Sequence, residues 1–224
     1  MVHKYLDISI ILLFTLLFLT DNLFAEPETK NIWQNKISEY SNNNDVHSLI
    51  FVKCKENSSE AQIELYKKSD NNNFELTLKS QGFIGKNGLG KEKEGDLKSP
   101  KGDFGIIQAF GIKPNPGTTI EYLNINENHY CCDENSQYYN KIIDAKQVNH
   151  KCKGEHIIKY IPQYNYAFFI DYNKECEYPK GSAIFMHCKG KKPYTAGCVS
   201  VDEEIMVKIL KGIDSSTRIC IYNE

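Results

Sequence analysis

Short runs of apolar and β-branched residues, separated by polar turns, make up most of the chain after residue 47. Runs of this kind are typical of strands, and clusters of Asn, Asp, Ser and Gly between them are typical of turns. The turn at 69–73 is expected to join the second and third strands into a hairpin. The predicted strands are residues 48–54, 61–67, 73–79, 104–110, 166–171, 182–187 and 217–222.

One late segment has the periodicity of a helix instead. Ser200 and Glu203 have the spacing of a capping box, and Gly212 lies near the expected end. The apolar residues that recur on one helical face are Ile205, Met206, Ile209, Leu210 and Ile213. Many short strands with one late helix predict a mainly β fold, a sandwich or barrel-like single domain with long loops.

The N-terminal segment has the pattern of an export signal. Lys4 precedes an apolar run from Ile8 to Leu19, and Ala25 ends the segment. The run is too short to cross a bilayer comfortably as a helix, but it is typical of a secretory signal. We therefore expect a signal peptide at 1–25, with an uncleaved N-terminal anchor as the alternative. A polar, Asn-rich linker at 26–46 and a folded domain at 47–224 are expected to follow, in the periplasm or cell envelope.

The charge of the chain is nearly balanced. The formal net charge is −2 and the pI is about 6.3. No basic field would therefore draw the protein to nucleic acid or to an anionic membrane, and neither is expected as a partner.

Eight cysteines fit an oxidising compartment. If one of them is a free catalytic thiol, the other seven cannot all pair. We expect a disulfide from Cys152 to either Cys131 or Cys132, because these residues lie in a polar segment. Cys54 and Cys220 lie on the first and last predicted strands, so a second bond between them stays open.

The same polar segment has a competing interpretation as a zinc site. Its candidate ligands are His129, Cys131, Cys132, His150, Cys152 and His156. Zinc prefers such ligands, but no standard zinc spacing is present, so we expect a disulfide and no metal or cofactor. The Gly-rich loop at 85–90 lacks the Gly-Lys-Ser/Thr ending of a phosphate-binding loop and is expected to be a tight turn.

The stretch from Gly181 to Glu204 carries the strongest chemical pattern. An apolar strand leads to His187, and a polar loop returns to Cys198 just before the predicted helix. A cysteine nucleophile needs a base within reach, a lowered pKa and donors for an oxyanion. His187 would be that base, and the N-terminus of the helix would stabilise the thiolate. The alternative is a buried structural cysteine beside a core histidine.

Several short motifs follow one another along the predicted domain. They are GKNGLG at 85–90, KEGD at 93–96, SPKGDF at 99–104, SQYYN at 136–140, DYN at 171–173 and the segment 181–198. In this order they resemble the catalytic domain of YkuD-type L,D-transpeptidases. The likeness covers residues 47–224, the whole predicted domain.

The resemblance implies roles for particular residues. Cys198 would be the nucleophile and His187 the general base, with the backbone carbonyl of Cys188 orienting the imidazole. The N–H groups of Gly197 and Cys198 would bind the oxyanion. Residues that would contact substrate are Thr195, Tyr172 and Ser182, although tyrosines such as Tyr172 are more often packing residues.

The resemblance also implies an activity. Such enzymes attack the bond between an L-centre and a D-residue in a peptidoglycan stem peptide and release D-alanine. The thioester then passes to an amine of another stem, which is transpeptidation, or to water, as in an L,D-carboxypeptidase or endopeptidase. The expected partners are stem peptides, and the expected state is a monomer. A non-catalytic murein-binding module is the alternative from another class.

The sequence departs from the familiar pattern of the family. Ala196 replaces the second His of Ser/Thr-His-Gly-Cys, Val199 and Ser200 follow the cysteine, and the interval from His187 to Cys198 is short. The nucleophile and base remain, but the choice between an amine and water as acceptor stays open.

Overall fold

The computed structural model describes residues 31–224, so the predicted signal peptide at 1–25 and the start of the linker lie outside the described residues. Contacts divide the chain into two units, residues 1–36 and 37–224. Helix α1 (Ile32–Ser41) begins in the first and ends in the second. It lies within the segment 26–46 that the sequence indicates to be a linker, and its weak apolar face explains why the pattern missed it. In the described part of the chain, no helix combines the length and the apolar character needed to cross a bilayer.

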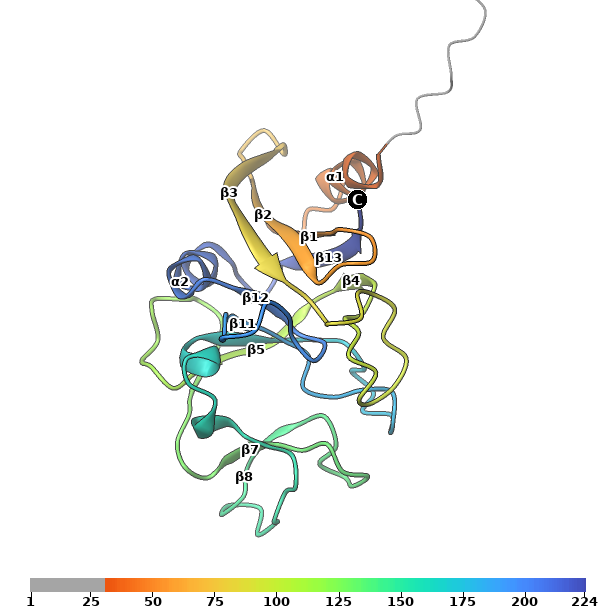
Figure 1. The fold of residues 1–224 in the computed structure, drawn as a ribbon. Coiled ribbons are helices and arrows are strands. Elements are labelled where there is room, and N and C mark those ends of the chain that lie inside the picture. The colour runs from red at the N-terminus through yellow and green to blue at the C-terminus, as the bar shows by residue number, and fades with distance from the viewer. Residues whose placement is uncertain (1–30) are drawn as a thin grey trace, which may run out of the picture. The chain divides into compact units, whose positions relative to one another are not determined.

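A ten-stranded mixed sheet is the framework of the second unit (Figure 1). It confirms the predicted mainly β fold. In sheet order the strands are β4 (Gly102–Phe104), β13 (Arg218–Asn223), β1 (Ser48–Cys54), β2 (Glu60–Lys68), β3 (Phe74–Phe83), β12 (Val199–Val201), β11 (Phe185–Cys188), β10 (Ala167–Ile170), β5 (Ile106–Gly111) and β6 (Tyr122–Asn124).

The predicted strands recur with two local differences. The hairpin between β2 and β3 forms, and the Ser69 N–H donates to the Asn73 carbonyl at 2.8 Å. The expected strand at 104–110 is interrupted at Gly105, whose N–H donates to the Asp171 carboxylate at 2.7 Å instead of to a strand. Strand β11 begins only at Phe185, because Ala183 has a positive φ of 54° and breaks the extended backbone before it.

Alternation along β10 and β11 divides their side chains between two hydrophobic clusters. Phe168 and Met186 belong to the larger core, to which helix α2 (Glu203–Gly212) contributes its apolar face. Phe169 and Phe185 belong to a smaller cluster that contains Cys198. Since successive side chains of a strand point to opposite faces, the same two strands support both the core and the site.

The late helix is confirmed, but its predicted cap is wrong. The N-cap residue is Asp202, whose side chain makes no capping hydrogen bond. Ser200 lies inside β12, where it pairs with His187 of β11 and Phe83 of β3. Pairing on both sides holds Ser200 in the extended conformation, so the capping box suggested by the local pattern does not form.

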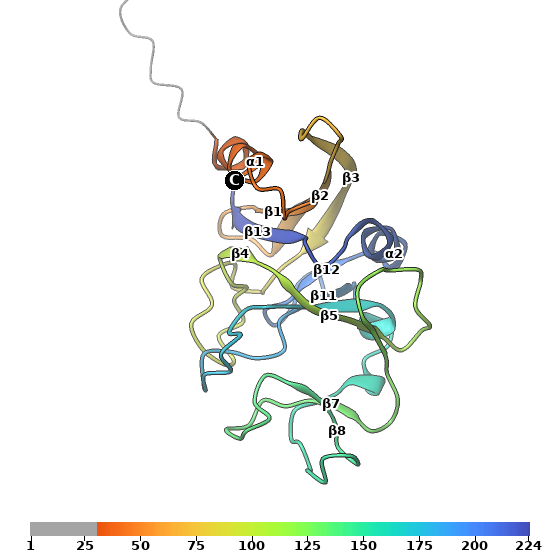
Figure 2. The ribbon, with the colours of Figure 1, turned by 180° about the vertical axis from the view of Figure 1, so that it is seen from behind.

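A second, three-stranded sheet forms in the polar segment that holds the alternative zinc ligands (Figure 2). Its strands are β8 (Ile142–Asp144), β7 (His129–Cys131) and β9 (Glu155–His156). Two short 3₁₀ helices follow, η1 (Ile157–Lys159) and η2 (Gln163–Asn165). Strands of two or three residues show no periodicity, which is why the sequence did not predict this sheet.

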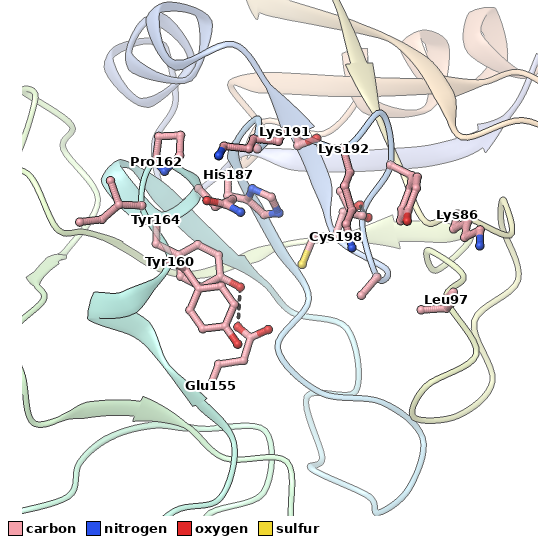
Figure 3. Close-up of a pocket in the computed structure, with 17 residues that line it drawn as sticks. Lys86, Leu97, Glu155, Tyr160, Pro162, Tyr164, His187, Lys191, Lys192 and Cys198 are labelled. Atoms are coloured by element: carbon pink, nitrogen blue, oxygen red, sulfur yellow. Dashed lines mark hydrogen bonds between the residues drawn. The ribbon is translucent and has the colours of Figure 1, made fainter.

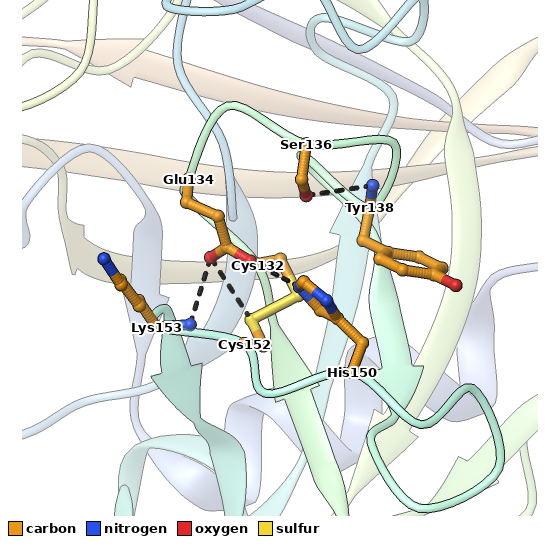
Figure 4. The surroundings of a disulfide bond; sticks show 7 residues. All are labelled: Cys132, Glu134, Ser136, Tyr138, His150, Cys152 and Lys153. Carbon is orange, nitrogen blue, oxygen red and sulfur yellow. Dashed lines mark hydrogen bonds and ion pairs between the residues drawn. A yellow bond between two sulfur atoms is a disulfide. The ribbon is translucent and has the colours of Figure 1, made fainter.

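One disulfide, Cys132–Cys152, joins the ends of this segment, with a Cα–Cα distance of 5.5 Å (Figure 4). It confirms one of the two pairings expected for Cys152 and leaves Cys131 a free thiol. Glu134 lies beside it and accepts a hydrogen bond from the Lys153 N–H at 3.0 Å. Of the histidines in the alternative zinc set, His150 lies 2.7 Å from the Glu134 carboxylate.

The bond left open between Cys54 and Cys220 does not form. Strands β1 and β13 are neighbours, as expected, but Cys220 aligns with Phe51 and Cys54 with Asn223. A register offset of three residues separates the two thiols by about 10 Å along the strands, beyond the reach of a disulfide. Both cysteines are buried in the core.

The disulfide generates a prediction about stability. Cys132 and Cys152 are 20 residues apart, so replacing both by serine should lower the free energy of unfolding by about 3 kcal/mol, because the unfolded chain loses a loop constraint. Urea denaturation measures the change. Wild-type protein under reducing conditions should match the double variant, and Cys176→Ser is the control. Equal midpoints for the double variant and wild type would contradict the expectation.

Candidate active site

The parallel pairing of β11 with β12 brings His187 near Cys198. His187 lies opposite Ser200, two residues beyond Cys198, and the loop between the strands turns the chain back. Within β11, His187 shares its face with Phe185, on the side of the smaller cluster that contains Cys198. Both residues are buried, with 7% of His187 and 8% of Cys198 exposed.

Hydroxyl groups hold the loop that carries the thiol. The Ser99 hydroxyl, which is fully buried, donates to the backbone carbonyl of Gly197 at 2.6 Å and accepts the Gly85 N–H at 2.9 Å. The Thr195 hydroxyl donates to the Cys198 carbonyl at 2.6 Å. These bonds fix the backbone on both sides of the sulfur. They also give a structural reason for the serine in the SPKGDF motif, to which the sequence assigned no role.

The Cys198 sulfur lies against the backbone before β11. The thiol donates to the Ala183 carbonyl at 3.2 Å and accepts the Phe185 N–H at 3.3 Å. Asn140 in turn fixes this backbone, since its side-chain oxygen accepts the Ala183 N–H at 3.0 Å and its amide donates to the Asn173 carbonyl at 3.0 Å. Asn140 therefore links the SQYYN and DYN motifs to the thiol.

The imidazole of His187 is held in one tautomer. Its Nδ1 lies 2.8 Å from the backbone carbonyl of Cys188, which only accepts hydrogen bonds, so Nδ1 carries the proton. In the neutral ring, Nε2 then has the free lone pair. Burial lowers the pKa of His187 to about 4, against the opposing effect of the hydrogen bond to Cys188. His187 is thus a neutral base at physiological pH.

The thiol is neutral as well. Burial, and then the nearby Glu155 carboxylate, raise the pKa of Cys198 to about 12, and the Phe185 N–H and Lys91 offset this only in part. The expected stabilisation of a thiolate by the helix N-terminus was wrong, because β12 separates Cys198 from α2. The resting site therefore holds a thiol and a neutral imidazole, and proton transfer has to accompany attack by the sulfur.

Two cavities meet at Cys198. The larger has a volume of about 630 Å³ and includes His187, Tyr164 and a rim of lysines (Figure 3). The smaller, of about 130 Å³, includes Cys131 and Ala183. The residues that line both are Leu97, Glu155, Ala196 and Cys198. Position 196, where the family pattern has a second histidine, therefore lies at the junction of the two cavities, and alanine leaves this junction open.

Not all of the other predicted site residues line the two cavities at Cys198. Thr195 lines the large cavity and Ser182 the small one. Tyr172 lines neither of these two cavities, and its hydroxyl donates to the Lys180 carbonyl at 2.7 Å. The Gly197 N–H donates to the Thr195 hydroxyl at 3.1 Å, so this predicted oxyanion donor is engaged within its own loop. In the described part of the chain, no acceptor is seen for the Cys198 N–H.

Two further polar residues at the site lie outside every motif. Tyr164, which is buried, donates its hydroxyl to the Glu155 carboxylate (Figure 3). Its ring makes a T-shaped contact with the imidazole of His187, with centroids 5.5 Å apart and an angle of 86° between the planes. Neither residue carries a signal in the sequence, because both depend on the small sheet and the 3₁₀ helix that the pattern did not predict.

The protonation state of the site predicts how Cys198 reacts with iodoacetamide. Since the pKa of the thiol is about 12, the alkylation rate should rise about tenfold for each pH unit, without a plateau, between about pH 7 and about pH 10. The background for this measurement is Cys176→Ser, which removes a partly exposed thiol. Peptide mapping by mass spectrometry follows Cys198. A plateau near neutral pH would indicate a preformed thiolate–imidazolium pair instead.

The buried hydroxyl behind the loop predicts a cost in stability. Ser99→Ala leaves the Gly85 N–H without its acceptor, and the Gly197 carbonyl loses a donor. The free energy of unfolding should fall by about 1–3 kcal/mol, measured by urea denaturation. The matched control is Ser80→Ala, whose hydrogen bond to the Gln81 carbonyl is exposed and should matter little. Equal losses in the two variants would contradict the role given to Ser99.

Comparisons with known proteins find similarity among solved structures alone. No family model and no curated protein matches the chain. Among solved structures, the chain is similar to the Ldtfm–avibactam carbamoyl enzyme, at 10% identity and a TM-score of 0.36, over 80% of this chain and 49% of that one. The chain thus spans about half the length of that protein. At this identity and score, the likeness assigns no activity to the chain.

Proposed function

We propose that the chain is an exported peptidoglycan enzyme, an L,D-transpeptidase that acts on tetrapeptide stems through a thioester on Cys198. The observation that carries the proposal is a free thiol and a neutral imidazole with a fixed tautomer, both lining one cavity. This arrangement has the nucleophile and the oriented base that acyl transfer needs. The motifs that resemble YkuD-type L,D-transpeptidases add the substrate class.

The first half of the reaction follows from the resting protonation states. The thiol turns from the Ala183 carbonyl, Nε2 of His187 takes its proton, and the sulfur attacks the scissile carbonyl. The Cys198 N–H, for which no acceptor is seen among the described residues, would stabilise the oxyanion. When the peptide C–N bond breaks, the proton on His187 passes to the leaving amine of D-alanine, and the acyl group remains on Cys198 as a thioester.

The rim of the large cavity suits an anionic peptide. Lys86, Lys191 and Lys192 line it, together with Tyr194, whose ring lies 5.6 Å from the ammonium groups of Lys86 and Lys192. Stem peptides carry free carboxylates, which these side chains would attract. A pure murein-binding module needs neither a free thiol nor an oriented imidazole, so the site supports the enzyme over the binding module.

Purified tetrapeptide muropeptides test the proposal. Wild-type protein should release D-alanine and form an acyl-enzyme, both detected by mass spectrometry. Cys198→Ala should abolish both. His187→Gln should slow acylation by about 10²–10⁴-fold, the usual contribution of a general base. The control is Cys176→Ser, a free cysteine that lines neither of the two cavities at Cys198. Normal turnover by Cys198→Ala would rule out the mechanism.

A further inference from the structure

Glu155 lines both of the cavities that meet at Cys198. Among the described carboxylates that line them, Glu94 and Asp133 belong to the small cavity alone, and Glu155 lines both. Its strand, β9, pairs with β7, where Cys131 lies opposite Glu155. Tyr164 donates to Oε2 of Glu155, and no donor to Oε1 is seen among the described residues. One carboxylate oxygen is therefore held in place while the other is available where the cavities meet the thiol.

We propose that Glu155 is the base that accepts a proton from an incoming ammonium group in the second half of the reaction, and that it thereby selects an amine over water as acceptor. The inference rests on the proposed function, which it deepens. It concerns the step that the sequence left open, the fate of the thioester on Cys198.

The charges around Glu155 favour a cation there. Glu94 and Asp133 share the small cavity, and the ammonium of Lys91 is already bound, 3.0 Å from Asp96 and 3.2 Å from the Lys93 carbonyl. Tyr160, Tyr164, Cys131 and Cys198 also face Glu155 and are neutral at pH 7. The large cavity that Glu155 lines also includes Lys86, Lys191 and Lys192, but the charges that shift the pKa of Glu155 are those of Asp133 and Glu94. Burial, and then Asp133 and Glu94, raise the pKa of Glu155 to about 7, although the Tyr164 hydrogen bond opposes the shift. A carboxyl with this pKa is an effective proton acceptor near neutrality.

Glu155 does not assist the first half of the reaction. A negative charge near Cys198 raises the pKa of the thiol and opposes its ionisation. Once Cys198 is acylated there is no thiolate to repel, and the carboxylate is free to act on the acceptor. Glu155, which lines both cavities beside Cys198, therefore belongs to the second half.

Two protons leave the nitrogen of the acceptor in the proposed step. The ammonium R–NH₃⁺ gives one proton to Glu155 and becomes the neutral amine, whose nitrogen forms a bond to the thioester carbon. The second proton of the nitrogen passes to Nε2 of His187 as the C–S bond breaks, and His187 returns it to the departing sulfur. The products are the new amide and the free thiol, and Glu155 releases its proton to solvent.

Acetylation of Cys198 by an activated ester tests the proposed role of Glu155 without a stem peptide. In a Cys176→Ser background, p-nitrophenyl acetate loads Cys198 with an acetyl group, and the ratio of aminolysis to hydrolysis is then measured. D-Alaninamide is the cationic acceptor, and hydroxylamine is the matched acceptor that is neutral at the assay pH. Because both products arise from one acyl-enzyme, the ratio does not depend on the rate of acylation.

With D-alaninamide as acceptor, Glu155→Gln should lower the ratio of aminolysis to hydrolysis by about a hundredfold. With hydroxylamine as acceptor, the same ratio should fall far less. In wild type the D-alaninamide ratio should gain from deprotonation of Glu155 as the pH rises through about 7, and this inflection should vanish in the variant. Glu155→Asp should restore part of the ratio. Asp133→Asn, which removes a carboxylate from the small cavity alone, should have a smaller effect.

Two results would overturn the inference. One is a Glu155→Gln variant that keeps the parent's ratio of aminolysis by D-alaninamide to hydrolysis. This variant must have the same thermal unfolding midpoint as the parent, which shows that it is folded. The other is an equal fall of both ratios, which would show that Glu155 does not discriminate by charge. Tyr164→Phe keeps the carboxylate but removes its hydrogen bond, so it tests the same position if Glu155→Gln fails to fold. Failure of the muropeptide assay with a normal acetyl partition would count against the proposed substrate and not against Glu155.

Discussion

The site depends on the parallel pairing between β11 and β12. This pairing sets His187 opposite Ser200 and so fixes where Cys198 leaves the sheet. Because side chains alternate along a strand, a slip of one residue would turn His187 toward the larger core and bring Met186 or Cys188 to the cavity. The burial of Met186 and Cys188 on the core side therefore protects the register that keeps His187 at the cavity.

Hydrogen bonds in the surrounding loops fix the position of the Cys198 sulfur. Ser99 and Thr195 bind the backbone around Gly197 and Cys198, and Asn140 holds the Ala183 segment against which the thiol lies. Each of these side chains is buried and each bonds to backbone atoms, so the position of the thiol does not depend on exposed, mobile contacts. Buried hydrogen bonds of this kind are costly to break, which favours a single arrangement of the site.

Burial has a chemical consequence for this arrangement. It disfavours the charged forms of both reacting groups, raising the pKa of Cys198 and lowering that of His187. The site therefore differs from one in which a helix N-terminus preforms a thiolate. A neutral thiol is less reactive toward small oxidants and electrophiles than a thiolate is. In an oxidising compartment, this property would favour survival of the free Cys198 thiol.

Local patterns in the sequence were sufficient for the large elements. The strand at 48–54 was predicted with its observed bounds, and the apolar face of α2 was correctly identified. The choice of Cys198 and His187 as a pair also came from the sequence, since an apolar strand, a polar loop and a Gly-Cys ending are local features. The disulfide of Cys152 was narrowed to two partners for the same reason.

Long-range contacts decided the rest. Ser200 has the local spacing of a helix cap, but pairing with His187 and Phe83 makes it part of a strand. Cys54 and Cys220 lie on neighbouring strands, yet only the register shows that they do not meet. Glu155 and Tyr164 share a cavity with the thiol because of a short strand and a 3₁₀ helix that leave no periodic signal in the sequence. The sequence thus determined which residues alternate, turn and carry reactive groups, whereas strand register and burial, which arise only when distant segments pack, decided their neighbours and their protonation.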